Sequence, residues 1–176
     1  MFGNIEKTEL LNIVHRPSVL RGQFTERASH VLLFRFCGES RYRFGENTML
    51  HREGEILFIP KGSSYSVRKA CDGDASYIAV NFMAQAALEK PVKADISGLT
   101  DYRHLCTRLA GAVSPDTAAE RYRQKALFYE ALSLFCEASH PEYMTSGAYA
   151  IIEPAVEYLK TNLFDPVLKV GQLHVL

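Results

Sequence analysis

A polar side chain inside an otherwise apolar strand is the first candidate for ligand binding in this sequence. Arg35 interrupts the apolar run at residues 30–36, in phase with Val31 and Leu33. Side chains in a small barrel alternate between interior and exterior, so a buried Arg35 would share their side. Its guanidinium would need a partner there, such as a ligand carboxylate, phosphate or sugar hydroxyl. The alternative is an arginine that points to solvent or pairs with a protein carboxylate, as most arginines do.

Four more residues complete the predicted ligand-binding set. Tyrosine side chains on strands can line a pocket and offer hydroxyls, but they can equally lie at the edge of a core. The asparagine between Val80 and Phe82 is either a ligand contact or a structural amide whose hydrogen bonds stay within the protein. The full set consists of Arg35, Tyr42, Tyr65, Tyr77 and Asn81.

Spacings typical of catalytic and metal sites are missing. None of the six histidines stands in an HxH, HxxH or HExxH arrangement, so the local pattern of a metal site is absent. The sequence also lacks the GxSxG nucleophile elbow and the Gly-rich phosphate loops GxxxxGKS/T and GxGxxG. We therefore predict a protein that is not an enzyme and that has no catalytic residue, metal or cofactor.

Composition and charge restrict the partners. The 20 basic and 20 acidic residues cancel, whereas a free-standing nucleic-acid binder usually carries a basic excess. Cys37, Cys71, Cys106 and Cys136 form no CxxC pair, which is typical of reduced thiols in the cytosol. Residues 1–16 do not resemble a signal peptide, and no apolar stretch is long enough to span a bilayer. We predict a cytoplasmic protein without membrane association that does not bind DNA by itself.

The first half of the chain has the pattern of an all-β unit. Short apolar or alternating runs are separated by turn residues such as those at 45–47, 61–63 and 71–74. Closely and regularly spaced short strands indicate an antiparallel sandwich or barrel. The predicted strands lie at 10–15, 30–36, 41–44, 48–51, 55–60, 64–68 and 76–82.

The second half has helical periodicity. Apolar residues recur every three or four positions at 99–113 and again along 118–138. The longer helix is apolar over so much of its circumference that it must be covered on more than one side. The barrel can cover one side of this helix. The other side can be covered by a second copy of the protein, or by other parts of the same chain. Contacts in a dimer would come from Tyr122, Ala126, Tyr129 and Ser133.

One segment has a more specific spacing. Residues 54–65 have the order Gly, five residues, Pro, one residue, Gly, two residues, Tyr. Gly54 makes the entry turn, Pro60 ends the strand, and Gly62 permits a tight reversal. This pattern resembles the second conserved motif of the cupin barrels, in which a metal-binding His usually takes the place of Tyr65. The HxH pair of the first cupin motif has no match, so the resemblance implies a barrel without the metal, with Tyr65 at its mouth.

The order of the parts resembles the arabinose-regulator (AraC) family of bacterial transcription factors. Residues 31–82, with GESRYRF, GEILFIPKGSSYSV and YIAVNF, look like its sensor barrel, and 152–176 look like the opening of its DNA-binding module. The resemblance implies an α+β fold: an antiparallel cupin-like β-barrel (double-stranded β-helix or jelly roll) followed by an α-helical dimerisation region. The implied parts are a ligand-binding barrel with an N-terminal arm at 1–90, the helical region at 91–145, and a linker with an incomplete helix-turn-helix start at 146–176.

These patterns predict the ligand-sensing and dimerisation region of a bacterial AraC-type regulator. Its partners would be a small-molecule effector, sugar-like or a small acid, and a second copy in a homodimer. Without a recognition helix to enter the major groove, DNA would be bound only through a C-terminal helix-turn-helix domain that this chain lacks. Two alternatives stay open: a cupin-type enzyme with an unrecognised metal site, and a pure dimerisation module with a filled barrel.

Overall fold

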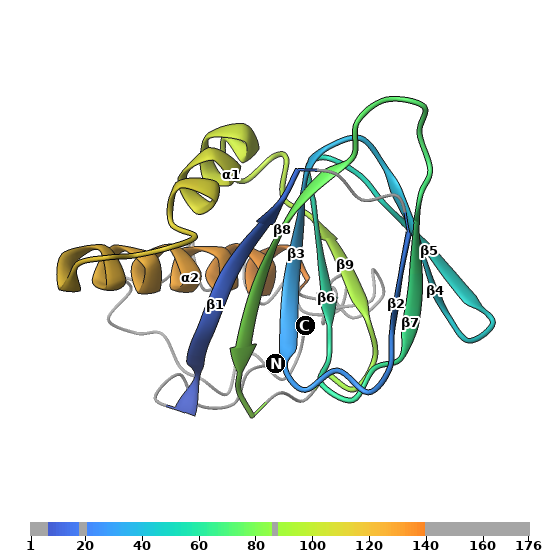
Figure 1. Cartoon of the computed structure of the whole chain (residues 1–176), viewed down its shortest axis with the longest axis horizontal. Coiled ribbons are helices and arrows are strands. Elements are labelled where there is room, and N and C mark those ends of the chain that lie inside the picture. The colour runs from blue at the N-terminus through green and yellow to red at the C-terminus, as the bar shows by residue number, and fades with distance from the viewer. Residues whose placement is uncertain (1–6, 18–20, 86–87, 140–176) are drawn as a thin grey trace, which may run out of the picture. The chain divides into compact units, whose positions relative to one another are not determined.

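The computed structural model describes residues 7–17, 21–85 and 88–139, which form two β-sheets and two α-helices (Figure 1). The predicted helical segments within 152–176 lie outside these described residues. The elements are β1 Glu9–Arg16, β2 Arg21–Phe24, β3 His30–Cys37, β4 Ser40–Phe44, β5 Asn47–His51, β6 Glu55–Ile59, β7 Tyr65–Lys69, β8 Ser76–Met83, β9 Val92–Asp95, α1 Tyr102–Gly111 and α2 Ala118–Ala138.

The strands form two antiparallel sheets that pack against each other. The larger sheet has the strand order β1-β8-β3-β6-β9, and the smaller sheet has the order β2-β7-β4-β5. In Figure 1 the two helices lie beside the larger sheet, on the side away from the smaller one. The predicted α+β fold, an antiparallel cupin-like β-unit followed by helices, is confirmed, and its strands form a sandwich of two sheets.

Two strands were not predicted. β2 has the sequence RGQF and β9 has VKAD, so each is short and contains only one β-branched or aromatic residue. Both are edge strands: β2 pairs with β7, and β9 pairs with β6. Their extended conformation therefore results from pairing with the neighbouring strand and not from the local sequence. Because β9 pairs as far as Asp95, the larger sheet extends beyond residue 90.

Apolar residues fill one layer on each face of the larger sheet. Val31 and Leu33 of β3 belong to the layer between the sheets, whereas Leu32 and Phe34 belong to the layer beneath the helices. β3 is thus buried on both faces, which explains why its sequence is apolar without alternation. Arg35 follows in phase with Val31 and Leu33, and its side chain lies on the inner side.

Helix α2 begins at a complete capping box. The Thr117 side chain accepts a hydrogen bond from the Glu120 backbone N–H, and the Glu120 side chain accepts one from the Thr117 N–H. The helix then packs one side against the larger sheet. Its Phe128 lies against Phe82 with ring centroids 5.3 Å apart, and its Phe135 lies against Phe58 at 5.7 Å.

The opposite side of α2 is exposed. Tyr122 is 75% exposed and Tyr129 is 39% exposed. Ala126 and Ser133, on the same side of the helix, are also exposed. These are the four residues predicted to contact a second copy. Tyr129 is partly covered, because its hydroxyl donates a hydrogen bond to Thr8 O at 3.3 Å. Neither of the described helices is long and apolar enough to span a membrane.

Candidate ligand-binding site

A cavity of about 180 Å³ lies between the two sheets. Its walls come from both sheets and from the segment that links β2 to β3. Four of the five residues in the predicted ligand-binding set line it. The lining residues are Val14, Arg16, Phe24, Arg27, Leu33, Tyr42, Tyr65, Val67, Tyr77, Ala79 and Asn81.

Arg27 ties the polar groups of this cavity together. Its Nη1 donates to the Tyr65 hydroxyl at 3.0 Å, and its Nη2 donates to Asn81 Oδ1 at 2.6 Å. The Asn81 amide nitrogen in turn donates to Asn12 Oδ1 at 2.7 Å. Asn81 is therefore both a cavity-lining residue and a member of an internal hydrogen-bond network.

Arg27 was not predicted from the sequence. It lies in a loop, where no strand or helix periodicity indicates which way a side chain points. Backbone hydrogen bonds from Arg27 N to Ser63 O and from Gly62 N to Arg27 O hold that loop against the turn after β6. The preceding Glu26 has a φ of 45°, in the left-handed region that residues other than glycine rarely adopt. The left-handed Glu26 cannot be read from the residue type.

Arg35 lies behind the cavity wall and is completely buried. Its Nη2 donates to the Tyr42 hydroxyl at 3.1 Å and its Nη1 donates to Ser76 O at 3.4 Å, while its guanidinium carbon lies 5.7 Å from the centre of the Tyr77 ring. It does not reach solvent, and it forms no ion pair with a carboxylate among the described residues. Its Nε has no hydrogen-bond partner there. Arg35 therefore orients two tyrosines that line the cavity and leaves a buried positive charge beside it.

His51, which the sequence did not indicate, completes this buried layer. Its ring lies 5.9 Å from that of Tyr42, and its Nε2–H donates to Glu55 O at 2.9 Å. Burial, followed by the positive charge of Arg35, lowers the pKa of His51 to about 3. The ring is thus neutral at physiological pH and adds no second charge.

The electrostatics of the cavity favour an anion. Two arginines line it and a third lies behind it, whereas no carboxylate is among the lining residues. Burial raises the pKa of Tyr42 and of Tyr65, although Arg35 and Arg27 respectively oppose this effect. Both phenols therefore keep their protons and can donate hydrogen bonds. The arrangement suits binding of a small carboxylate or of a polar oxygen group.

The residue at the place of the cupin metal ligand has a different role here. Tyr65 accepts a hydrogen bond from Arg27 and stacks on Phe24 with ring centroids 4.8 Å apart. Among the described residues, no group of three or more His, Cys, Asp and Glu side chains is arranged to hold a metal ion. At this position the structure places a tyrosine that is hydrogen-bonded to an arginine.

Comparison with known proteins gives matches to solved structures but none by sequence. No protein-family model matches the sequence, and no curated protein matches it significantly. An apo variant of ToxT from Vibrio cholerae strain SCE256 has a TM-score of 0.54 at 10% identity, over 95% of this chain and 69% of that one. ToxT from Vibrio cholerae O395 has a TM-score of 0.46 at 9% identity, over 96% and 68%. The Cnp3 cupin domain of Schizosaccharomyces pombe has 0.36 at 12% identity, over 48% and 61%.

The first of these matches has the highest TM-score of the three and covers 95% of this chain. ToxT is a regulator of the AraC family. This chain therefore shares its fold with that regulator, in agreement with the fold that the sequence resemblance implied.

Proposed function

We propose that this chain is the effector-sensing region of an AraC-type transcription regulator in the cytoplasm. The observation that carries the proposal is the cavity between the sheets, in which Arg27, Tyr65 and Asn81 converge inside a fold shared with a regulator. Apolar walls with a few convergent polar groups are the usual lining of small-molecule sites, although this cavity is smaller than most of them. Sequence-specific DNA binding would be the task of a separate helix-turn-helix domain.

Between the two predicted effector classes, the charge of the site favours a small acid over a sugar. A sugar site usually combines neutral donors and acceptors with carboxylates, and the lining of this cavity has no carboxylate. Arg27 can present its planar donors to a carboxylate, and Tyr42 and Tyr77 can add contacts. The volume of about 180 Å³ restricts the effector to a compact molecule.

Thermal unfolding in the presence of small carboxylic acids, sugars and sugar phosphates tests this function. We expect one compact acid to raise the melting temperature, because binding to the folded state alone contributes about 2.7 kcal/mol at a ligand concentration of 100 Kd. Arg27→Gln removes the guanidinium and should weaken binding of that acid by about tenfold or more. Arg103→Gln, which removes an exposed arginine from α1, serves as the matched control and should bind normally.

Three results would contradict the proposal. A flat response across a broad panel would favour a pure dimerisation module with a filled barrel. Equal binding by the Arg27→Gln variant would place the effector elsewhere. Stoichiometric iron, manganese or zinc in the purified protein would favour the cupin-type enzyme.

The effector would act by shifting a conformational equilibrium. A ligand that binds one arrangement of the barrel more tightly stabilises that arrangement by its difference in affinity. The coupling to DNA would then depend on how the helical region transmits this difference to the DNA-binding domain.

We also propose that the helical region forms a homodimer through the exposed side of α2. Tyr122 and Tyr129 offer large amphipathic contact surfaces, and Ala126 permits close approach of a second helix. Ala126→Arg should shift the protein from dimer to monomer in sedimentation experiments, because two arginines would meet near a symmetry axis. Lys61→Glu, in the turn after β6, is the control and should remain dimeric. A wild-type monomer at high concentration would contradict this assignment.

A further inference from the structure

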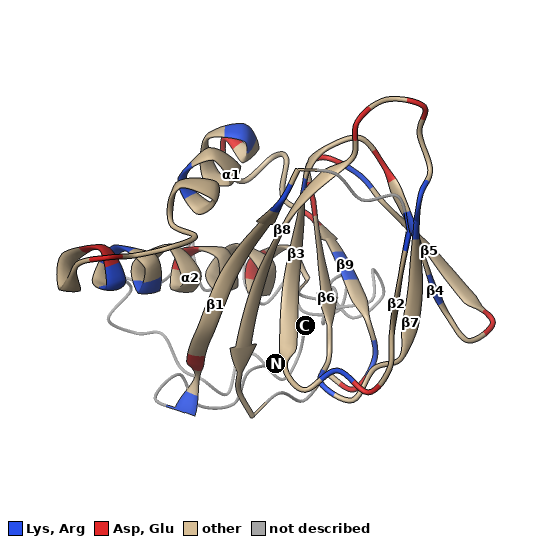
Figure 2. Cartoon of the chain, in the orientation of Figure 1, with Lys and Arg blue, Asp and Glu red and all other residues tan. Residues whose placement is uncertain are grey.

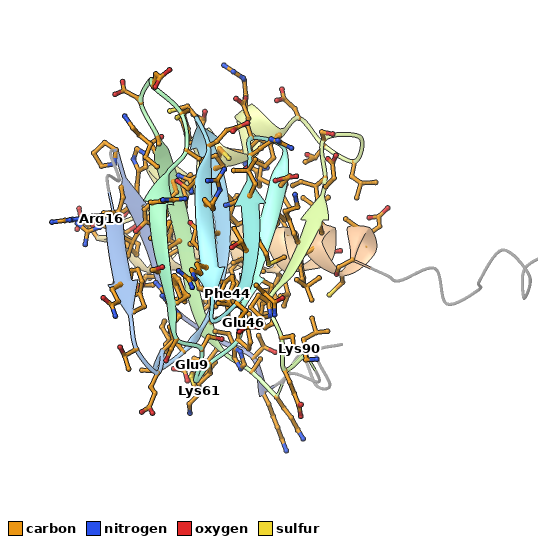
Figure 3. The ribbon with its side chains drawn as sticks, turned by 90° about the vertical axis from the view of Figure 1, so that its right-hand side faces the viewer. Glu9, Arg16, Phe44, Glu46, Lys61 and Lys90 are labelled. Atoms are coloured by element: carbon orange, nitrogen blue, oxygen red, sulfur yellow. The ribbon has the colours of Figure 1, made fainter. Side chains whose placement is uncertain are left out.

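The outer face of the smaller sheet carries a cluster of arginines. Arg68 on β7 pairs with Arg21 on β2 and with Arg41 on β4. Cross-strand partners point to the same side of a sheet, so these three side chains stand next to one another. Arg43 lies two residues further along β4, on the same face. Figure 3 views this sheet from outside, and Figure 2 shows basic residues on the same strands.

The positive charges of this cluster are not balanced by neighbouring carboxylates in ion pairs among the described residues. The three paired arginines are exposed and, like Arg43, form no ion pair with any described residue. Arg43 uses its Nε to donate to Gly45 O at 2.9 Å. Like charges placed directly opposite each other on neighbouring strands are destabilising. An arrangement that lowers stability without a compensating contact is most readily explained by a function.

The arginines surround a hollow of about 740 Å³, here termed the arginine hollow. Four arginines and one acidic residue, Glu46, line it, and Gln23, Thr48 and Ser66 add neutral hydrogen-bonding groups. Figure 3 shows Glu46 at one end of this face. Its volume lies within the roughly 300–1,000 Å³ of ordinary small-molecule sites. Arginine forks with amide and hydroxyl side chains are the groups that proteins use to hold phosphate oxygens.

We propose that the arginine hollow binds a small molecule that carries two or more linked phosphate groups. The span from Arg21 across Arg68 to Arg41 covers two interstrand spacings, about 10 Å, which matches a short phosphate chain. Two other occupants fit less well. Val67 is the only apolar side chain in the described lining, so the hollow lacks the apolar centre of a protein interface. A net charge of zero and a compact patch do not match the extended basic surface of a DNA-binding face.

Calorimetric titration of the whole chain with inorganic tripolyphosphate tests this site. Wild-type protein should bind, and binding should weaken as salt concentration rises. Arg68→Gln removes the central guanidinium and should weaken binding by about tenfold or more. Arg103→Gln removes an arginine of α1 and should leave binding unchanged. Arg27→Gln, in the cavity between the sheets, should also leave it unchanged, which separates this site from the proposed effector site.

The stability of the free protein supplies a second measurement. Arg68→Gln relieves two repulsive cross-strand pairs and should raise the melting temperature without ligand by about 1–3 °C. An Arg68→Gln variant that is more stable than wild type but binds tripolyphosphate less tightly would support a binding site. The proposal is overturned if tripolyphosphate does not bind, if citrate binds as tightly, if only duplex DNA binds, or if Arg68→Gln loses stability together with affinity.

Discussion

Replacement of Phe135 by alanine is expected to lower the free energy of unfolding by about 3–5 kcal/mol. Phe135 is completely buried and lies against Phe58, so its ring fills the layer between α2 and the larger sheet. Removal of the ring takes away apolar contacts and leaves a cavity that neighbouring side chains close only in part. The barrel should tolerate this change less well than any substitution on the exposed side of the same helix.

Urea denaturation followed by circular dichroism measures this effect. Tyr122→Ala is the matched control, because it removes an aromatic ring of α2 that is 75% exposed, and measured at a concentration where the protein is monomeric it should change stability by less than about 0.5 kcal/mol. Phe135→Leu keeps most of the volume and should cost clearly less than the alanine variant. Equal, small losses for Phe135→Ala and Tyr122→Ala would show that α2 does not form part of the core.

The sequence predicted the elements whose patterns arise from burial. β3 is apolar throughout because both of its faces are covered, and α2 starts at its predicted first residue because Thr117 and Glu120 form a capping box. β2 and β9 could not be predicted, since their pairing depends on edges of sheets that exist only after folding. Period and capping are local properties, whereas edge pairing is a property of the tertiary structure.

Four of the residues that line the cavity could be predicted because their direction also follows from a local pattern. Tyr42, Tyr65, Tyr77 and Asn81 line the cavity because alternation along strands determines which side they face. Arg35 was predicted as a ligand contact, with exposure to solvent or a carboxylate partner as the alternatives. In the structure it is buried and does not line the cavity, but it contacts Tyr42 and Tyr77, which do. The side-chain direction of one residue does not show how far that side chain reaches or what covers it.

The two features that sequence reasoning missed both depend on contacts between distant segments. Arg27 reaches the cavity only because the loop before β3 is tied to the turn after β6. The arginine hollow exists only because Arg21, Arg41 and Arg68 come from three strands that become neighbours. The formal net charge of zero does not indicate such a cluster, because it sums basic and acidic residues that lie on different surfaces of the folded protein.

Acidification is expected to destabilise this protein through His51, with the loss beginning near pH 6.5. Burial and Arg35 lower the pKa of His51 in the folded state to about 3, from 6.5. Between these values the unfolded state binds a proton that the folded state does not, so stability falls as pH falls. The stabilisation is complete above pH 6.5 and disappears toward pH 3. The unfolding free energy should drop by roughly 2–3 kcal/mol between about pH 7 and pH 4.5.

Comparison with His51→Gln isolates this contribution, because the glutamine amide can still donate to Glu55 O but does not titrate in this range. Urea denaturation at several pH values should give a clearly smaller pH dependence for the variant. The remaining slope would include His30, whose pKa burial also lowers. Arg35→Met removes the neighbouring positive charge and should raise the folded-state pKa of His51, so this variant should retain more stability in acid than wild type. The same slope in wild type and His51→Gln would mean that His51 is not buried beside Arg35, and the buried layer behind the cavity would then be wrong.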